Sequence, residues 1–176
     1  LFFLYPPLIL ISIYFIDTIV IKFRNKKILL YINTILVVIL LNNIYNLVTL
    51  HPFQYIYFNS IFEKKANKLF EIDYWGVSNK FSLEKIVKDN FQKEQITIGV
   101  ASFTNLYLSK KMLPEKFKNK LIISGQDFNN VDYIFNNNYF EINPKYDDKY
   151  NIPKNYRKYS ELKKGKILIN EFYIKE

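Results

Sequence analysis

The chain has 176 residues, no cysteine, one histidine and a formal net charge of +9. The lack of cysteine excludes disulfide frameworks and thiolate metal sites, and a single histidine excludes a histidine-cluster metal site. A basic chain invites a nucleic-acid interpretation, but the lysines are spread through the polar half and only Arg24 and Arg157 supply guanidinium groups. We therefore predict no metal site, no identifiable cofactor and no nucleic-acid partner.

Two apolar segments open the sequence. Residues 1–50 are almost entirely apolar, whereas residues 59–176 carry most of the charge, so the mean hydropathy of −0.08 describes neither part. Residues 1–21 and 28–50 each have the length of about 20 residues that a helix needs to cross a bilayer core. Buried helices of a soluble protein are the alternative, but such helices are seldom apolar on every face. We predict two transmembrane helices, at 1–21 and 28–50, with the lipid bilayer as their partner.

The short loop at 22–27 predicts the orientation of these helices. It carries Lys22, Arg24, Lys26 and Lys27 and no acidic residue. Short loops rich in lysine and arginine stay on the cytoplasmic side of a membrane. We therefore expect an integral membrane protein, of a bacterial inner membrane, with residues 51–176 outside the cytoplasm.

Polar residues in the second apolar segment suggest further membrane helices. Asn42, Asn46 and Thr49 form a stripe, which we expect to pack on other helices or to line a wet cavity. The sequence also begins at Leu1, inside an apolar run and without the charge pattern of a signal peptide. We expect a fragment, whose N-terminal transmembrane helices precede Leu1.

Aromatic residues dominate the next segment, 51–77. His51-Pro-Phe-Gln-Tyr-Ile-Tyr-Phe-Asn59 follows the second apolar segment directly, and Glu71-Ile-Asp-Tyr-Trp-Gly76 contains the only tryptophan. This composition is typical of an interfacial aromatic belt, with Trp75 as an anchor. Asp73 could orient a hydroxyl group or accept backbone donors, and Gly76 suggests a turn with an unusual backbone angle.

The two motifs HPFQYIYFN (51–59) and DYWG (73–76) together resemble the C-terminal region of multispanning GT-C type membrane glycosyltransferases. This group is related to the protein O-mannosyltransferases and the lipid A aminoarabinose transferases. The resemblance covers about residues 40–90 and is of moderate specificity, because aromatic motifs recur at membrane interfaces for physical reasons. It assigns possible substrate-side roles to His51, Pro52, Gln54, Tyr55, Tyr57, Asn59, Asp73, Tyr74, Trp75 and Gly76.

The resemblance implies transfer of a sugar from a polyprenyl-phosphate donor to an acceptor outside the cytoplasm. In that group the catalytic acid lies in the first extracytoplasmic loop, and no position of this sequence corresponds to that loop. The catalytic residues are therefore unknown and expected outside this chain, which should be inactive by itself. A non-enzymatic, membrane-anchored extracytoplasmic binding domain is the alternative.

Residues 78–176 read as a small soluble α/β or α+β domain. The patterns predict helices at 78–90 and 103–113, strands at 95–100, 121–124 and 131–135, a polar loop at 136–153, and a hairpin formed by 156–162 and 166–173. The segment Ile98-Gly-Val-Ala-Ser-Phe has one glycine and does not match a phosphate-binding loop. Since nothing in this part resembles an independent active site, a binding or packing role suits it better.

Overall fold

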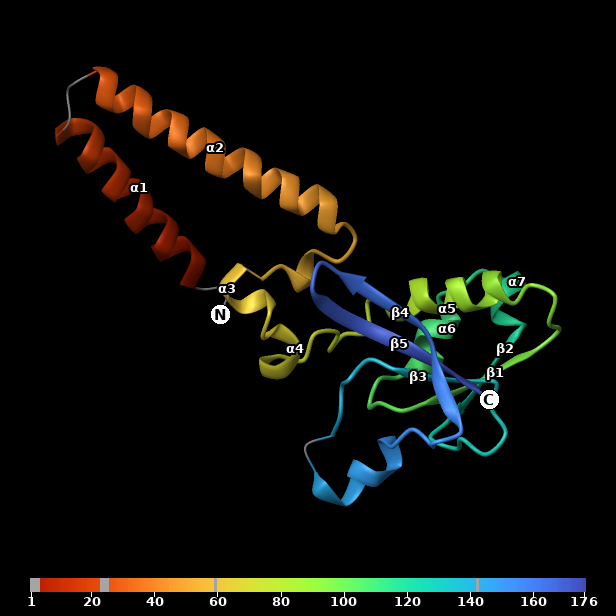
Figure 1. Cartoon of the computed structure of the whole chain (residues 1–176). Coiled ribbons are helices and arrows are strands. Elements are labelled where there is room, and N and C mark those ends of the chain that lie inside the picture. Colours follow the sequence, from red (N-terminus) through yellow and green to blue (C-terminus); the bar gives the residue numbers. More distant parts are fainter. Residues whose placement is uncertain (1–3, 23–25, 59, 142) are drawn as a thin grey trace. The chain divides into compact units, whose positions relative to one another are not determined.

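The computed structural model describes residues 4–22, 26–58, 60–141 and 143–176 (Figure 1). The chain divides into two compact units, Leu1–His51 and Pro52–Glu176. Each unit is described by itself below.

The N-terminal unit consists of two long apolar helices, α1 (Tyr5–Lys22) and α2 (Lys26–Leu50). They have 18 and 25 residues, and both are long and apolar enough to cross a membrane by length and composition. At a rise of 1.5 Å per residue, they span about 27 and 37 Å. Within the described residues, the segments predicted at 1–21 and 28–50 are thus confirmed as helices, over 5–22 and 26–50. Lys22, Lys26 and Lys27 lie at the helix ends, while Arg24 falls outside the described residues.

The serine and threonine hydroxyl groups of these helices have acceptors within the same helix. Each donates to the carbonyl four residues earlier, as seen for Ser12, Thr18, Thr34 and Thr49. Thr49 donates to the Tyr45 carbonyl at 2.9 Å. Its hydroxyl therefore needs no partner helix, and the polar stripe expected on this helix reduces to the carboxamides of Asn42 and Asn46.

The C-terminal unit is built on a mixed sheet of five strands. The strands are β1 (Ile96–Val100), β2 (Leu121–Gly125), β3 (Tyr133–Asn136), β4 (Tyr156–Lys164) and β5 (Ile167–Lys175). Their order is β2-β1-β3-β5-β4, with β1 parallel to both neighbours and β5 antiparallel to both of its own. The turn between β4 and β5 is made by Gly165 at φ +57°. Of the two predicted fold classes, this mixed sheet with crossover helices is α/β.

Three helices cover one face of the sheet (Figure 1): α5 (Asn79–Asp89), α6 (Leu106–Lys111) and α7 (Glu115–Lys118). Leu83 and Ile86 of α5 are fully buried against Ile96 and Ile98 of β1, and Phe135 of β3 completes the main core. The alternation of β1 places its isoleucines on this face, as expected for a strand that is covered by helices.

The opposite face of the sheet has a smaller core of Ala101, Val131, Ile134 and Tyr156. Phe128 packs there over Gly99 of β1. A Cβ atom at position 99 would lie 2.7 Å from Cδ1 of Phe128, well inside van der Waals contact. Glycine is therefore required in this strand by close packing, rather than by its backbone angle.

The segment after the apolar helices belongs to the same compact unit as the sheet. It contains η2 (Gln54–Ile56), α3 (Ser60–Glu63) and α4 (Ala66–Leu69). Phe53 and Ile56 are buried with Ile167 and Ile169 of β5 in a separate core. This packing attaches the segment to the C-terminal strand, about a hundred residues away in the sequence.

Two of the predicted elements differ from the structure. The helix predicted at 103–113 is shorter, because the Asn105 side chain accepts a hydrogen bond from the Leu108 amide at 3.2 Å and caps the helix there. The polar loop predicted at 136–153 contains a 3₁₀ helix, η3 (Pro144–Tyr150), which begins at a proline. The remaining predicted helix and strands are confirmed within a few residues.

Gly99→Ala should lower the free energy of unfolding by about 1–3 kcal/mol, because the added methyl group overpacks against Phe128. Urea unfolding of the full chain in detergent micelles measures this change. The double variant Gly99→Ala/Phe128→Leu should recover part of the loss, since the ring is removed. Equal losses in the single and double variants would contradict this contact.

Candidate functional site

The turn that contains the Asp-Tyr-Trp-Gly motif is the starting point of the site. The Gly76 amide donates to the Asp73 carbonyl at 2.9 Å, and the Asn79 amide donates to the Gly76 carbonyl at 3.1 Å. Gly76 has φ +63°, and a Cβ atom there would collide with the Asn79 carboxamide. The unusual backbone angle expected for Gly76 is confirmed, and it allows Asn79 to lie directly beneath the turn.

The carboxylate of Asp73 is 1 % exposed and anchors the turn. The Tyr55 hydroxyl donates to Oδ1 of Asp73 at 2.8 Å, and the Ser78 hydroxyl donates to Oδ2. The two donors come from opposite sides of the motif: Tyr55 from η2 and Ser78 from the residue before α5. Buried carboxylates require such donors, because an unpaired charge in the interior is very costly.

Burial and hydrogen bonding act on Asp73 in opposite directions. Burial raises the pKa of the Asp73 carboxyl, and the hydrogen bonds from Ser78 and Tyr55 partly offset this rise. Burial, followed by the charge of Asp73, raises the pKa of the Tyr55 hydroxyl. Tyr55 therefore keeps its proton at neutral pH and serves as a donor to Asp73.

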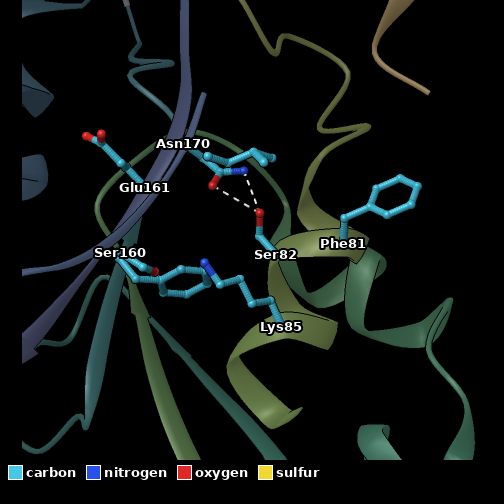
Figure 2. A pocket seen from close by; sticks show the side chains of 8 residues that line it. Phe81, Ser82, Lys85, Ser160, Glu161 and Asn170 are labelled. Atoms are coloured by element: carbon cyan, nitrogen blue, oxygen red, sulfur yellow. Dashed lines mark hydrogen bonds between the residues drawn. The ribbon is translucent and has the colours of Figure 1, made fainter. Parts of the chain in front are cut away.

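The hydrogen-bond network continues from Ser78 to the sheet. Nδ2 of Asn170, in β5, donates to the Ser78 hydroxyl at 2.6 Å and to the Ser82 hydroxyl at 2.7 Å. Ser82 in turn donates to Oδ1 of Asn170 at 3.0 Å, and both bonds between these residues are visible in Figure 2. The crevice beside them has a volume of about 50 Å³, which holds a water molecule rather than a ligand. This network is structural.

A much larger cavity, of about 540 Å³, is lined in part by the turn itself. We call it the aromatic cavity, and it is lined by residues 74–77, 79–81 and 103–105 together with Leu108, Ser109, Met112 and Tyr139. The motif turn, the first turn of α5, the loop after β1 and helix α6 therefore each supply one part of its wall. Its volume falls in the range of small-molecule sites.

Aromatic rings form the wall of this cavity. The ring centroids of Tyr74 and Trp75 lie 5.0 Å apart, those of Tyr74 and Tyr139 also 5.0 Å, and those of Phe103 and Tyr139 5.4 Å. Trp75 is 84 % exposed, so its indole contributes little to the core. Burial, and then a hydrogen bond with Tyr74, raise the pKa of Tyr139 to about 12, which keeps its hydroxyl protonated.

Polar groups form the floor. Asn79 is 1 % exposed, and its Nδ2 donates to the hydroxyls of Thr104 at 3.0 Å and Ser109 at 3.2 Å. Its Oδ1 is buried without a hydrogen-bond partner among the described residues. A buried acceptor of this kind costs about 1–3 kcal/mol unless water or a ligand donates to it. The floor thus offers an acceptor to a molecule that enters the cavity.

The aromatic cavity suits binding rather than acid–base chemistry. Among its described lining residues, Lys80 is the only one that is charged at neutral pH. The part of the lining that the structure describes contains no carboxylate, and the Asp73 carboxylate belongs to the network instead. The chemistry that it offers is stacking on aromatic faces together with neutral hydrogen bonds.

The structure brings part of the predicted site residues together. Tyr74, Trp75 and Gly76 line the aromatic cavity, and Asp73 and Tyr55 form the network that supports the turn. The others lie apart from the lining: Pro52 and Gln54 are half-buried, Tyr57 is exposed, and His51 belongs to the N-terminal unit. Asn59 lies outside the described residues.

Sequence reasoning missed the floor of the cavity and one wall, namely Asn79, Phe103, Thr104, Ser109 and Tyr139. One signal was available for the segment after β1. Ligands of α/β domains bind beyond the carboxyl ends of strands, and polar residues such as Thr104 follow that strand closely. No pattern linked Tyr139 to the motif, because their proximity results from the tertiary fold.

The pKa of Asp73 should exceed its ordinary value of 3.8, and Tyr55→Phe should raise it further by removing a donor to the carboxylate. The ¹³C shift of the Asp73 carboxyl against pH measures both values. Because the folded state holds this proton more tightly than the unfolded chain, the group stabilises the fold below pH 3.8. That stabilisation is lost as the pH rises through the folded pKa, and Asp73→Asn should abolish this part of the pH dependence.

Tyr57→Phe is the matched control, since Tyr57 lies two residues away and is 50 % exposed. It should leave the titration of Asp73 unchanged. A pKa at or below 3.8 in the wild type would show that the donors outweigh burial.

Comparisons with known proteins add no family to this description. No protein family, no curated protein and no solved structure matches the chain. The candidate site therefore stands on its geometry: a turn held by a buried carboxylate, with an aromatic cavity above an unpaired amide oxygen.

Proposed function

We propose that this chain is the C-terminal part of a GT-C type membrane glycosyltransferase-like protein, and that its outer domain binds a saccharide in the aromatic cavity. In this proposal α1 and α2 cross a bacterial inner membrane, and residues 51–176 lie outside the cytoplasm. The sugar donor is a polyprenyl-phosphate sugar, and the catalytic acid lies in a first extracytoplasmic loop to which no position of this sequence corresponds.

One observation carries the proposal: the motif that bears the resemblance forms the wall of the aromatic cavity. Trp75 presents an indole that is 84 % exposed, next to the rings of Tyr74 and Tyr139. Sugar rings have apolar C–H faces, which stack on aromatic rings, and hydroxyl groups, which donate to acceptors such as Oδ1 of Asn79. An aromatic wall above a polar floor matches both properties.

The same cavity supports a second function, a membrane-anchored binding domain without enzymatic activity. The observation in its favour is the lack of a carboxylate among the described residues that line the cavity. Glycosyl transfer requires an acid or base at the reacting bond. In both functions the cavity holds a saccharide. They differ in whether the protein that carries the cavity also transfers a sugar.

The proposed orientation predicts the outcome of proteolysis. Protease added to intact spheroplasts should digest residues 60–176, while the loop at 22–27 stays protected, because positively charged loops remain in the cytoplasm. Epitope tags in the loop and at the C-terminus report both outcomes. Digestion of the loop together with protection of the C-terminal tag would reverse the orientation.

Saccharide binding predicts a change in the fluorescence of Trp75, the only tryptophan of the chain. The full chain in phospholipid nanodiscs is titrated with maltotriose and with chitotriose, and at least one should shift the emission saturably. Phe103→Ala should weaken this binding by about tenfold, since a stacked ring contributes on the order of 1 kcal/mol. Phe91→Ala is the matched control, because Phe91 is 62 % exposed but lies outside the cavity lining.

The remaining outcomes separate the competing functions. Quenching of Trp75 by lipids labelled near the headgroup, without a response to either sugar, would make the aromatic wall a membrane contact and refute saccharide binding. The second measurement uses a chain extended by its upstream coding sequence, with a polyprenyl-phosphate sugar as donor. If that chain binds sugar but transfers none, the non-enzymatic domain is favoured.

A further inference from the structure

A second cavity, of about 470 Å³, lies beyond the carboxyl ends of the parallel strands β1 and β2. We call it the strand-end cavity, and it is lined by Val100, residues 102–107, Ile123, Gly125, Gln126 and Glu141. In open α/β sheets this edge is where ligands bind, because loops that leave neighbouring parallel strands separate there. The aromatic cavity shares only the loop at 103–105 with it.

The buried hydroxyl of Ser102 is the feature that points to a ligand. Ser102 is 2 % exposed, and its Oγ has no hydrogen-bond partner among the described residues. Buried hydroxyl groups are nearly always paired with protein or with ordered water. Ser102 lines the cavity two residues beyond the end of β1. Its unpaired hydroxyl is therefore placed to form a hydrogen bond with a molecule in that cavity.

The other polar groups of the strand-end cavity define the chemistry of that molecule. Glu141 supplies carboxylate oxygens, and Lys149 balances their charge through an ion pair of 2.8 Å. Gln126 and Thr104 add an amide and a hydroxyl group. No lysine or arginine is among the described lining residues, so a phosphate or carboxylate group would meet only Glu141 and neutral groups.

The end of β2 leaves room for the ligand, because a Cβ atom at Gly125 would meet nothing within 4 Å. Asn105 also lines the cavity, and its carboxamide oxygen is paired with the Leu108 amide. A metal ion is not favoured, since the described residues contain no group of three or more histidine, cysteine, aspartate or glutamate side chains suited to one.

We infer that the strand-end cavity is a second binding site, for an uncharged polyhydroxylated ligand such as a single sugar ring. A ring hydroxyl pairs with Oγ of Ser102, and a neighbouring pair of hydroxyls donates to the Glu141 carboxylate. This inference does not rest on the aromatic cavity, because Ser102 and Glu141 line only the strand-end cavity.

Thermal unfolding of the full chain in nanodiscs, with glucose, mannose or N-acetylglucosamine as probes, tests the inference. At least one sugar should raise the melting temperature, and Ser102→Ala should weaken that binding by about tenfold, the effect of one hydrogen bond. Without sugar, Ser102→Ala should melt no lower than the wild type, because it removes a hydroxyl that has no partner.

Ser124→Ala is the matched control. Ser124 lies at the end of β2, where its hydroxyl bonds to the carbonyls of Ile98 at 3.3 Å and Asp127 at 3.2 Å, and it is not part of the cavity lining. This variant should melt below the wild type without sugar, yet keep the full shift with sugar.

Three outcomes would overturn the inference: a Ser102→Ala variant that binds sugar like the wild type, one that melts as low as Ser124→Ala without sugar, or protection by inorganic phosphate in place of sugars. The proposed function is tested separately, through the emission of Trp75, which lines only the aromatic cavity. Loss of the Trp75 response with retention of the Ser102-dependent shift would refute the proposed function alone, and the converse would refute this second site alone.

Discussion

A carboxylate that is buried must be surrounded by donors, and in this protein Asp73 receives them from the chain on both sides of its own turn. Tyr55 reaches it from η2, and Ser78 reaches it from the start of α5. Through Ser78 the network extends to Asn170 in the C-terminal strand. The side chain of Asp73 thus links the segment after the apolar helices, the start of helix α5 and, through Ser78, the sheet. The Asp-Tyr-Trp-Gly turn is held where these three meet.

The rigid turn explains why an aromatic cavity can exist beside it. Tyr74 and Trp75 are half or more exposed and gain little from burial, so their position depends on the backbone that carries them. Gly76 completes the turn, and Asn79 lies directly beneath it. A side chain at position 76 would collide with the Asn79 carboxamide. The site is preorganised by a supporting layer of hydrogen bonds, which is a general requirement for precise binding.

Each cavity has one buried polar atom without a partner in its lining. Three buried side-chain atoms of the described residues have no hydrogen-bond partner: Oδ1 of Asn79 and Oγ of Ser102, whose residues line the two cavities, and the Tyr150 hydroxyl, which belongs to neither lining. Folded proteins retain such costs mainly where function requires them. The loop at 103–105 separates the cavities, and its position after β1 follows from the parallel arrangement of β1 with β2.

Local patterns in the sequence were sufficient for the long helices and the strands, but not for the short helices. The uniform apolarity of 5–22 and 26–50 predicts helices without a polar face, and the β-rich alternation in 96–100 predicts a strand. The unusual angle of Gly76 also followed from its place in a turn. What only the tertiary structure decided is which polar residues meet. Tyr55 is hydrogen-bonded to Asp73 and Asn170 to Ser78, over separations of 18 and 92 residues. The rings of Tyr139 and Tyr74, 65 residues apart in the sequence, are in contact. Such contacts are set by how the sheet, helices and loops pack together, and periodicity along the chain carries no information about them.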